Sequence, residues 1–146
     1  MEKIAVFPGS FDPFTIGHKA ILDMALPLFD KIIVAVGVNS AKNYFLEAPQ
    51  RVRAIADLYA GNPKIVVETY DSLTVDFCKK RNATAILRGL RNTTDFEYEK
   101  TMAQTNRALA GIETVFLMTP PEYEHISSSI VRELLAYGAD ASKFLP

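Results

Sequence analysis

Short apolar segments alternate along the chain with amphipathic ones. The apolar segments are rich in β-branched residues, which is typical of buried strands, and they cover 3–7, 31–38, 64–69, 85–88 and 114–118. The intervening segments repeat apolar residues every three or four positions, which predicts helices, at 20–29, 49–59, 75–81, 94–110 and 127–137. Strands that alternate with helices form parallel sheets, because each helix carries the chain back across the sheet.

The run at 31–38 is almost continuously apolar, which is typical of a parallel strand covered on both faces. A chain of 146 residues also has the usual size of one domain. We therefore predict a single α/β domain over residues 1–146. Its five-stranded parallel sheet carries helices on both faces, in a Rossmann-like arrangement with right-handed crossovers.

Composition excludes several classes of function. The formal net charge of −1 gives no general attraction to nucleic acid or to an anionic membrane. Cys78 is the only cysteine, and the two histidines, His18 and His125, show no metal-ligand spacing. No signal peptide is visible, and the longest apolar run, 32–38, is too short to span a bilayer. We expect a soluble cytoplasmic protein with no metal ligands of its own.

The stretch 7–18 contains two prolines and two glycines and joins the first strand to the first helix. We expect it to be irregular, with backbone N–H groups turned toward a ligand. His18 falls in the first turn of the helix, where the positive pole favours phosphate. An ordinary tight loop would look similar, and the stretch is neither a P-loop nor a Gly-x-Gly-x-x-Gly fingerprint.

Polar and cationic residues follow every strand of the predicted sheet. Ligands bind beyond the carboxyl ends of such strands, where the strand order reverses. The residues expected at this edge are Ser10, His18, Lys42, Leu73, Thr74, Arg88, Gly89, Leu90, Arg91, Ser127, Ser128 and Ser129. In a chain of balanced charge, this convergence predicts a local phosphate site.

Arg88 and Arg91 flank a glycine at the end of the fourth strand. Arginine forks suit phosphate oxygens, and glycine permits close backbone approach. A solvated loop is the alternative, more so for Arg91 than for Arg88.

Asp95, Glu99, Met102 and Asn106 are spaced so that they share one helix face. For Asp95, a role at the helix N-terminus explains the carboxylate well. Glu99 lies deeper in the helix, so we expect it to contact a ribose or a base.

The serine triplet 127–129 opens the last helix. One serine is expected as the N-cap. Three hydroxyls are more than a cap requires, so we expect the triplet to bind a triphosphate.

Two stretches resemble the signatures of the nucleotidyltransferase superfamily. Thr15-Ile16-Gly17-His18 resembles its T/H-x-G-H signature, and Ile126-Ser127-Ser128-Ser129 with Val131-Arg132 resembles the I-S-S-S/T-x-x-R/K signature. The stretches 8–13, 88–91, 95–99 and 115–118 are similar to those of the bacterial phosphopantetheine adenylyltransferases. The likeness runs from the first strand to Pro146.

The resemblance implies a nucleotidyltransferase fold and the reversible transfer of AMP from ATP to 4′-phosphopantetheine. The products would be dephospho-coenzyme A and pyrophosphate, in coenzyme A biosynthesis. The family uses magnesium, which would arrive on the triphosphate, and commonly assembles as a homohexamer. We therefore expect Mg²⁺ as cofactor, ATP and 4′-phosphopantetheine as substrates, and a homo-oligomer.

The resemblance also implies which residues act. Those expected to contact ATP are Ser10, Phe11, His18, Gly89, Leu90, Arg91, Glu99, Tyr123, Glu124, His125, Ile126, Ser127, Ser128 and Ser129. Those expected to hold 4′-phosphopantetheine are Ser10, Lys42, Leu73, Thr74, Arg88, Met102, Asn106 and Glu133. Catalysis is expected from His18 at the transition state, from Lys42 on the attacking phosphate, and from Arg91 on developing charge.

The sequence departs from the family pattern in three places. Ser10 replaces the usual threonine and keeps the hydroxyl. Tyr123-Glu124-His125 stands where an aromatic–serine pair is frequent, and the sequence stops at Pro146 where relatives usually continue into another helix. The last two departures concern adenine contacts and oligomer contacts.

Two alternative functions remain open at this point. A related adenylyl- or cytidylyltransferase acting on a mononucleotide or polyol phosphate would share both signatures, although the stretches 88–91 and 95–99 favour the phosphopantetheine group. A non-catalytic nucleotide sensor would be favoured by replacement of His18 or Lys42, and both are present.

Overall fold

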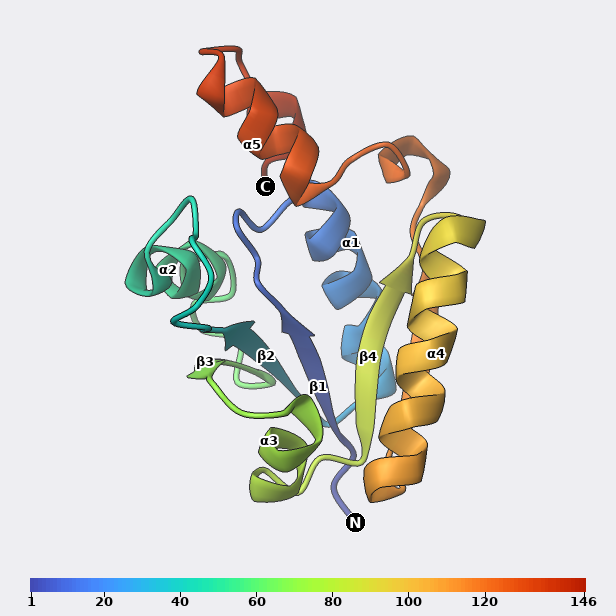
Figure 1. Ribbon diagram of the computed structural model, residues 1–146. Helices are drawn as coiled ribbons and strands as arrows, with labels where there is room; N and C mark the ends of the chain where they lie inside the picture. Colours follow the sequence, from blue (N-terminus) through green and yellow to red (C-terminus); the bar gives the residue numbers. More distant parts are fainter.

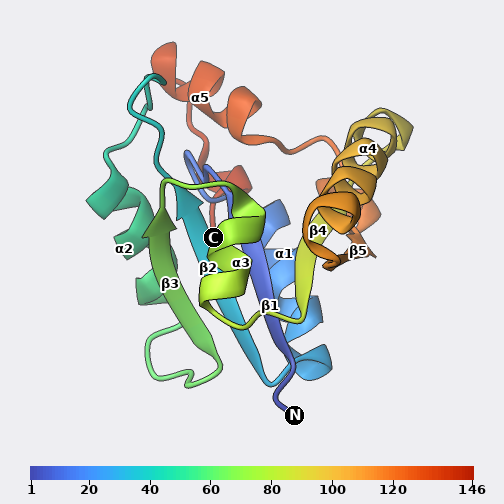
Figure 2. The same cartoon turned by 60° about the horizontal axis from the view of Figure 1, so that its bottom comes forward.

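A computed structural model describes all residues, 1–146, and confirms the predicted α/β fold. Five parallel strands form one sheet in the order β3-β2-β1-β4-β5; Figure 1 shows β3 to β4, and Figure 2 shows all five strands. The strands are β1 (Ile4–Gly9), β2 (Lys31–Gly37), β3 (Ile65–Tyr70), β4 (Ala85–Leu90) and β5 (Glu113–Met118). The order of elements along the chain is the predicted one.

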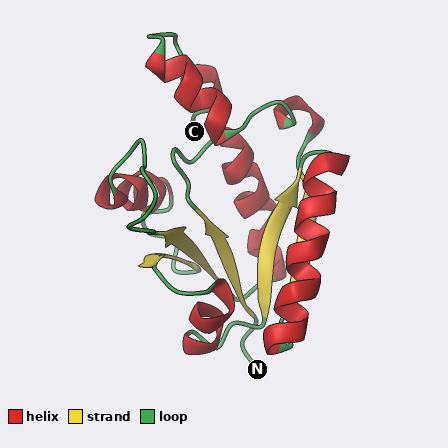
Figure 3. Cartoon of the chain, viewed as in Figure 1, coloured by secondary structure: helices red, strands yellow, loops and turns green.

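Helices cover both faces of the sheet, as Figures 1 and 2 show together. They are α1 (Ile16–Ala25), α2 (Ala48–Leu58), α3 (Thr74–Lys80), α4 (Thr93–Ala110) and α5 (Ser128–Ala136). Three 3₁₀ turns, at Leu26–Leu28, Pro121–Tyr123 and Ser142–Phe144, lie in the connections. Helix α5 lies beyond the carboxyl ends of the strands, away from the N-terminus (Figure 3). No helix combines the length and the apolar character needed to cross a membrane.

Two apolar layers sandwich the sheet. Ile32, Val34 and Val36 of β2 pack with α1 and α2 on one face. The alternate residues Ile33 and Ala35 pack on the other face, in a layer that includes Val75, Phe77 and Cys78 of α3. Because side chains alternate along a strand, the almost continuously apolar run at 31–38 supplies both layers. The prediction of a strand covered on both faces is confirmed.

Strands β1 and β4 both run further than predicted. Pro8 and Gly9 belong to β1, and Gly89 and Leu90 belong to β4. The expectation that the whole stretch 7–18 is irregular was therefore wrong at its start. Pro8 fits in the strand because it lies where β1 separates from β4, so its missing N–H leaves no ladder bond unmade.

The separation of β1 and β4 creates the opening at the sheet edge. Strands β1 and β2 stay in register from Ile4 to Gly9, whereas β1 pairs with β4 only at Ala5 and Val6. The chain winds outward in one direction from β1 to β3 and in the other from β4 to β5. This is the reversal of strand order at which ligands bind in such sheets.

Gly89 allows α1 to pack closely on β4. A Cβ atom placed on Gly89 would lie 2.8 Å from Cγ1 of Ile21 and 3.1 Å from its Cδ1. The sequence suggested that this glycine lets a phosphate approach the backbone. The structure gives it a packing role as well.

We expect the substitution Gly89→Ala to lower the free energy of unfolding by about 1–3 kcal/mol, because the added methyl group overpacks against Ile21. The double variant Gly89→Ala/Ile21→Ala should lose less stability than the sum of the two single variants. Urea denaturation of all four proteins provides the measurement. Strict additivity would contradict the contact.

Candidate active site

A cavity of about 350 Å³ opens where β1 and β4 separate. The loop after β1, the start of α1, the end of β4, the first turns of α4 and the start of α5 all line it. Most of the predicted site residues line this cavity: Ser10, Phe11, His18, Lys42, Arg88, Gly89, Arg91, Glu99, Ile126, Ser127 and Ser128. The predicted convergence at the carboxyl edge of the sheet is therefore confirmed as a spatial arrangement.

A smaller cavity of about 150 Å³ adjoins the first. The two share Pro8, Gly9, Arg88 and Glu99 in their walls. Thr74, Met102 and Asn106, which were predicted to hold 4′-phosphopantetheine, line the smaller cavity. The site thus has two compartments with Arg88 and Glu99 between them.

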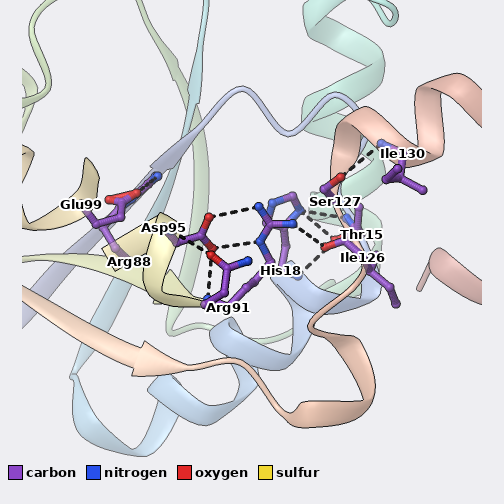
Figure 4. Close-up of polar contacts among 10 residues, drawn as sticks. Thr15, His18, Arg88, Arg91, Asp95, Glu99, Ile126, Ser127 and Ile130 are labelled. Atoms are coloured by element: carbon purple, nitrogen blue, oxygen red, sulfur yellow. Dashed lines mark hydrogen bonds and ion pairs between the residues drawn. The ribbon is translucent and has the colours of Figure 1, made fainter. Parts of the chain in front are cut away.

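Arg88 bridges the two separating strands and α4. Its Nη1 donates to the carbonyl of Pro8 at 2.7 Å, and its Nε donates to both carboxylate oxygens of Glu99, at 2.9 and 3.0 Å. Its Nη2 also donates to Glu99. Glu99 is only 6% exposed, so solvent screens its charge little. Arg88 balances this charge within the protein (Figure 4). Both of its oxygens are engaged in this structure.

Arg91 is held in the same way by another acid of α4, Asp95 in its first turn. Nε and Nη2 of Arg91 donate to the two carboxylate oxygens of Asp95, at 3.0 and 3.2 Å, and Nη1 donates to the carbonyl of Ile126 at 3.4 Å. The N-cap of α4 is Asn92, whose side chain accepts from the N–H of Asp95. Asp95 lies in the first turn of α4, as expected, and also accepts from the backbone N–H of Arg91 at 3.1 Å. It therefore has a role at the helix N-terminus and also orients Arg91.

His18 is fixed by the capping box that begins α1. The N–H of Thr15 donates to Nδ1 of His18 at 2.9 Å, and Oγ1 of Thr15 accepts from the N–H of His18 at 3.3 Å. Because Nδ1 accepts a backbone proton, the neutral ring carries its own proton on Nε2. Phe11 meets the ring edge-on and Phe14 stacks on it. The imidazole is thus a hydrogen-bond donor of fixed orientation (Figure 4).

Burial, followed by the positive charges of Arg88 and then Arg91, lowers the pKa of His18 from 6.5 to about 3. The ring is therefore neutral at physiological pH before an anion binds. The two arginines that lower this pKa are also the groups placed to attract phosphate.

Lys42 reaches the site from the segment between β2 and α2. Its Nζ donates to Oγ of Ser10 at 3.3 Å, and it lies 5.4 Å from the centre of the Tyr44 ring. No acid pairs with Lys42. Its charge is therefore available to a ligand.

The serine triplet supplies the N-cap of α5, as predicted. Ser127 is the N-cap and accepts from the N–H of Ile130. Ser128 donates its hydroxyl to the carbonyl of Pro13, and Ser129 accepts from Arg132. Ser127 and Ser129 only accept in these contacts, so their O–H donors remain available. The binding of a triphosphate by the triplet stays a prediction. The N–H groups of Ser128 and Ser129, in the first turn of α5, have no helical partner and remain available to an anion.

Comparison with known proteins agrees with this geometry. The cytidylyltransferase-like family matches residues 6–134. The chain is 51% identical to a phosphopantetheine adenylyltransferase of Bacteroides thetaiotaomicron, over 97% of this chain and 94% of the relative. It is 49% identical to one of Christiangramia forsetii, over 99% and 95%. The chain belongs to the phosphopantetheine adenylyltransferase family.

A solved structure shares the fold of this family member at low sequence identity. It is a bifunctional NMN adenylyltransferase/ADP ribose pyrophosphatase of Francisella tularensis, complexed with AMP and manganese. Its TM-score is 0.73 at 20% identity, with 99% of this chain and 44% of that chain covered. At this identity the likeness concerns the nucleotidyltransferase fold alone.

Several residues implied by the family resemblance line neither cavity. Leu90 is buried in the sheet. His125 packs its ring against Phe144, and Leu73 is 63% exposed. The remaining residues of this group are Tyr123, Glu124, Ser129 and Glu133. Their roles stay predictions.

Several residues of the site were not predicted to belong to it. Asp12, Thr15 and Arg132 line the larger cavity, and Arg51 lies buried behind it. Thr15 and Arg132 fall within the two family signatures, which could have indicated them. Asp12 and Arg51 act on backbone atoms, so no local sequence pattern reveals them.

The pKa of His18 predicts how stability depends on pH. The pKa of His18 is near 6.5 in the unfolded chain and about 3 in the folded one, so between these pH values the unfolded chain binds the proton and the folded chain does not. The stabilising contribution is therefore complete above pH 6.5 and is lost as the pH falls toward 3. Between pH 7 and 5 the wild-type protein should lose about 1–2 kcal/mol more stability than His18→Asn.

Urea denaturation at the two pH values provides the test. The variant His125→Asn, which removes the other histidine, should keep the pH dependence due to His18. Equal losses in the wild-type protein and His18→Asn would contradict a buried neutral imidazole.

Proposed function

We propose that this protein transfers AMP from ATP to 4′-phosphopantetheine, which yields dephospho-coenzyme A and pyrophosphate. The observation that carries the proposal is the near-complete match, at about half identity, to relatives named phosphopantetheine adenylyltransferase. The site geometry supports it, because two joined compartments suit two substrates that meet at one reacting phosphate. We further propose that the reaction takes place in the cytoplasm.

The larger compartment suits ATP. His18, Arg91 and the first turn of α5 all line it, and together they offer an imidazole N–H, a guanidinium and backbone N–H groups to phosphate oxygens. The nucleotide contacts that we propose within the cavity are Ser10, Phe11, His18, Gly89, Arg91, Glu99, Ile126, Ser127 and Ser128. We also retain Leu90, Tyr123, Glu124, His125 and Ser129 as predicted ATP contacts.

The smaller compartment suits the acceptor arm. It mixes apolar and polar walls, with Met102 and Ala103 beside Thr74, Asn106 and Thr114. Oγ1 of Thr114 is buried without a hydrogen-bond partner, and the amide groups of a pantetheine arm would supply one. We propose Ser10, Lys42 and Arg88 as contacts of the acceptor phosphate. Leu73 and Glu133 are retained as predicted contacts of the arm.

The chemistry needs positioning more than proton transfer. The attacking oxygen belongs to a phosphate that is already ionised at neutral pH. Lys42 and Arg88 lower the repulsion between the two anions and align the attacker, which is a proximity effect. The Nε2–H of His18 and the guanidinium of Arg91 stabilise negative charge that develops on the α-phosphate and on departing pyrophosphate.

Magnesium is proposed as the cofactor. The chain holds no group of three His, Cys, Asp or Glu side chains that could bind a metal ion, so the donor set fits an ion that arrives with the triphosphate. When bound, it would neutralise charge on the phosphate oxygens.

We propose a homo-oligomer, with a hexamer as the form implied by the resemblance. Large apolar side chains lie exposed on the single chain, among them Leu109, Met118, Ile130 and Tyr137. Burial of such side chains between subunits would stabilise an assembly.

The reaction is tested by pyrophosphate release with ATP and magnesium, with 4′-phosphopantetheine, nicotinamide mononucleotide or glycerol 3-phosphate as acceptor. We expect release with 4′-phosphopantetheine only, because the second compartment and Lys42 fit a long arm that ends in a phosphate. Release with another acceptor would overturn the substrate assignment. ATP binding without release from any acceptor would favour a nucleotide sensor.

We expect His18→Ala to lower kcat by about a hundredfold or more, while the dissociation constant for ATP changes much less. The reason is that Nε2–H meets charge that exists only in the transition state. Steady-state kinetics and calorimetric ATP titration separate the two quantities. Equal losses in turnover and affinity would contradict this role.

A further inference from the structure

Lys42 lies in a segment without regular structure, residues 38–47, between β2 and α2. Its Nζ reaches Ser10, in the loop after β1. On a mobile loop the ammonium group would not stay at this position, because fixing both the backbone and a long side chain costs conformational entropy. The structure holds the segment with two buried side chains, Asp12 and Arg51, which we call the buried anchor.

Arg51 joins three pieces of backbone. Its Nη1 donates to the carbonyls of Ser10 at 2.8 Å and of Gly37 at 2.9 Å, and its Nε donates to the carbonyl of Leu46 at 3.0 Å. The side chain is only 1% exposed. No carboxylate pairs with it. Removing an arginine from such a position would leave buried carbonyls without partners.

Asp12 holds the same segment from the other side. Its Oδ2 accepts from the N–H of Phe45 at 2.7 Å, and its Oδ1 accepts from the N–H of Leu46 at 2.8 Å. The residue is 4% exposed. Its own carbonyl accepts from Arg132 of α5 at 2.8 Å. The anchor therefore connects the segment 38–47 to both cavity walls that carry signature motifs.

Both neighbours of the Lys42 ammonium group depend on this anchor. Ser10, whose Oγ accepts from Lys42, is held by its carbonyl to Arg51. The Tyr44 ring lies 4.0 Å from the guanidinium of Arg51 and 5.4 Å from Nζ of Lys42. Tyr44 also accepts the N–H of Asn39 at 2.9 Å. Arg51 thus sets the position of the ring and the hydroxyl between which Lys42 lies.

We propose that Asp12 and Arg51 are positioning residues that place Lys42 for the acceptor phosphate. This inference rests on the proposed function, since it concerns the acceptor compartment of the same site. The anchor acts on catalysis through Lys42, because its side-chain hydrogen bonds end on the segment that carries this lysine, on Gly37 directly before that segment, and on Ser10.

The test compares Asp12→Asn and Arg51→Lys with the wild-type protein. Lysine lacks the planar fork with which arginine reaches three carbonyls. Asparagine is neutral and has one acceptor oxygen, so it cannot replace a carboxylate that accepts two N–H groups with its two oxygens. We expect each variant to raise the KM for 4′-phosphopantetheine about tenfold, with the KM for ATP changed less than twofold. In a Lys42→Ala background the same substitutions should change neither constant further.

The variant Arg53→Lys is the matched control, since Arg53 is an exposed arginine on the same helix. It should match the wild-type protein in both constants. Equal rises in the two KM values, or an effect that persists in the Lys42→Ala background, would overturn the proposal. Because two residues form the anchor, one variant that fails to fold leaves the other to decide.

Hydrogen exchange on the substrate-free proteins gives a second readout. Asp12→Asn and Arg51→Lys should speed amide exchange in residues 38–47 but not in α4. Unchanged exchange in that segment would overturn the proposal even if the enzyme proved to use another acceptor. If the wild-type protein released no pyrophosphate while the exchange result held, the proposed function alone would fail.

Discussion

The structure depends on one guanidinium group, that of Arg88, at the place where the sheet opens. A parallel sheet that binds a ligand at its reversal point must separate two strands there, and separation leaves backbone groups without partners. Arg88 satisfies the carbonyl of Pro8 on one strand while belonging to the other, and Glu99 balances its charge from α4. The opening is thus held at a fixed width by a charged side chain that also faces both compartments.

The other phosphate-facing side chains of the site are also held by contacts within the protein. Arg91 is oriented by Asp95, Arg132 by a backbone carbonyl and Ser129, and the neutral form of His18 by Thr15. Each group that would meet phosphate is held in place before any ligand arrives. Catalysis by charge stabilisation requires such preorganisation, because donors that must reorient during the reaction lose much of their effect. Lys42 is held less directly, since its Nζ contacts the hydroxyl of Ser10 and the Tyr44 ring, and both of these are positioned by Arg51.

Sequence reasoning predicted the order of elements, the parallel sheet and the edge where the site lies, because these follow from periodicity and chain direction. It failed where a role depends on backbone atoms brought together by the fold. Pro8 and Gly9 read as loop residues, yet the sheet accepts them at its opening. Arg51 sits among the apolar positions of α2 without any local sign that it points inward, since its three acceptors are carbonyls from distant segments.

The hydrogen bonds that hold residues 38–47 limit which changes of sequence this enzyme can accept during evolution. Asp12 and Arg51 hold the segment by the amides of Phe45 and Leu46 and by the carbonyls of Gly37 and Leu46, and every residue type except proline presents those groups. The side chains at positions 45 and 46 can therefore change during evolution without loss of these contacts. The number of residues between Gly37 and Leu46 cannot change in the same way. A deletion in this stretch would shorten the reach of Lys42 even if every surviving side chain stayed the same.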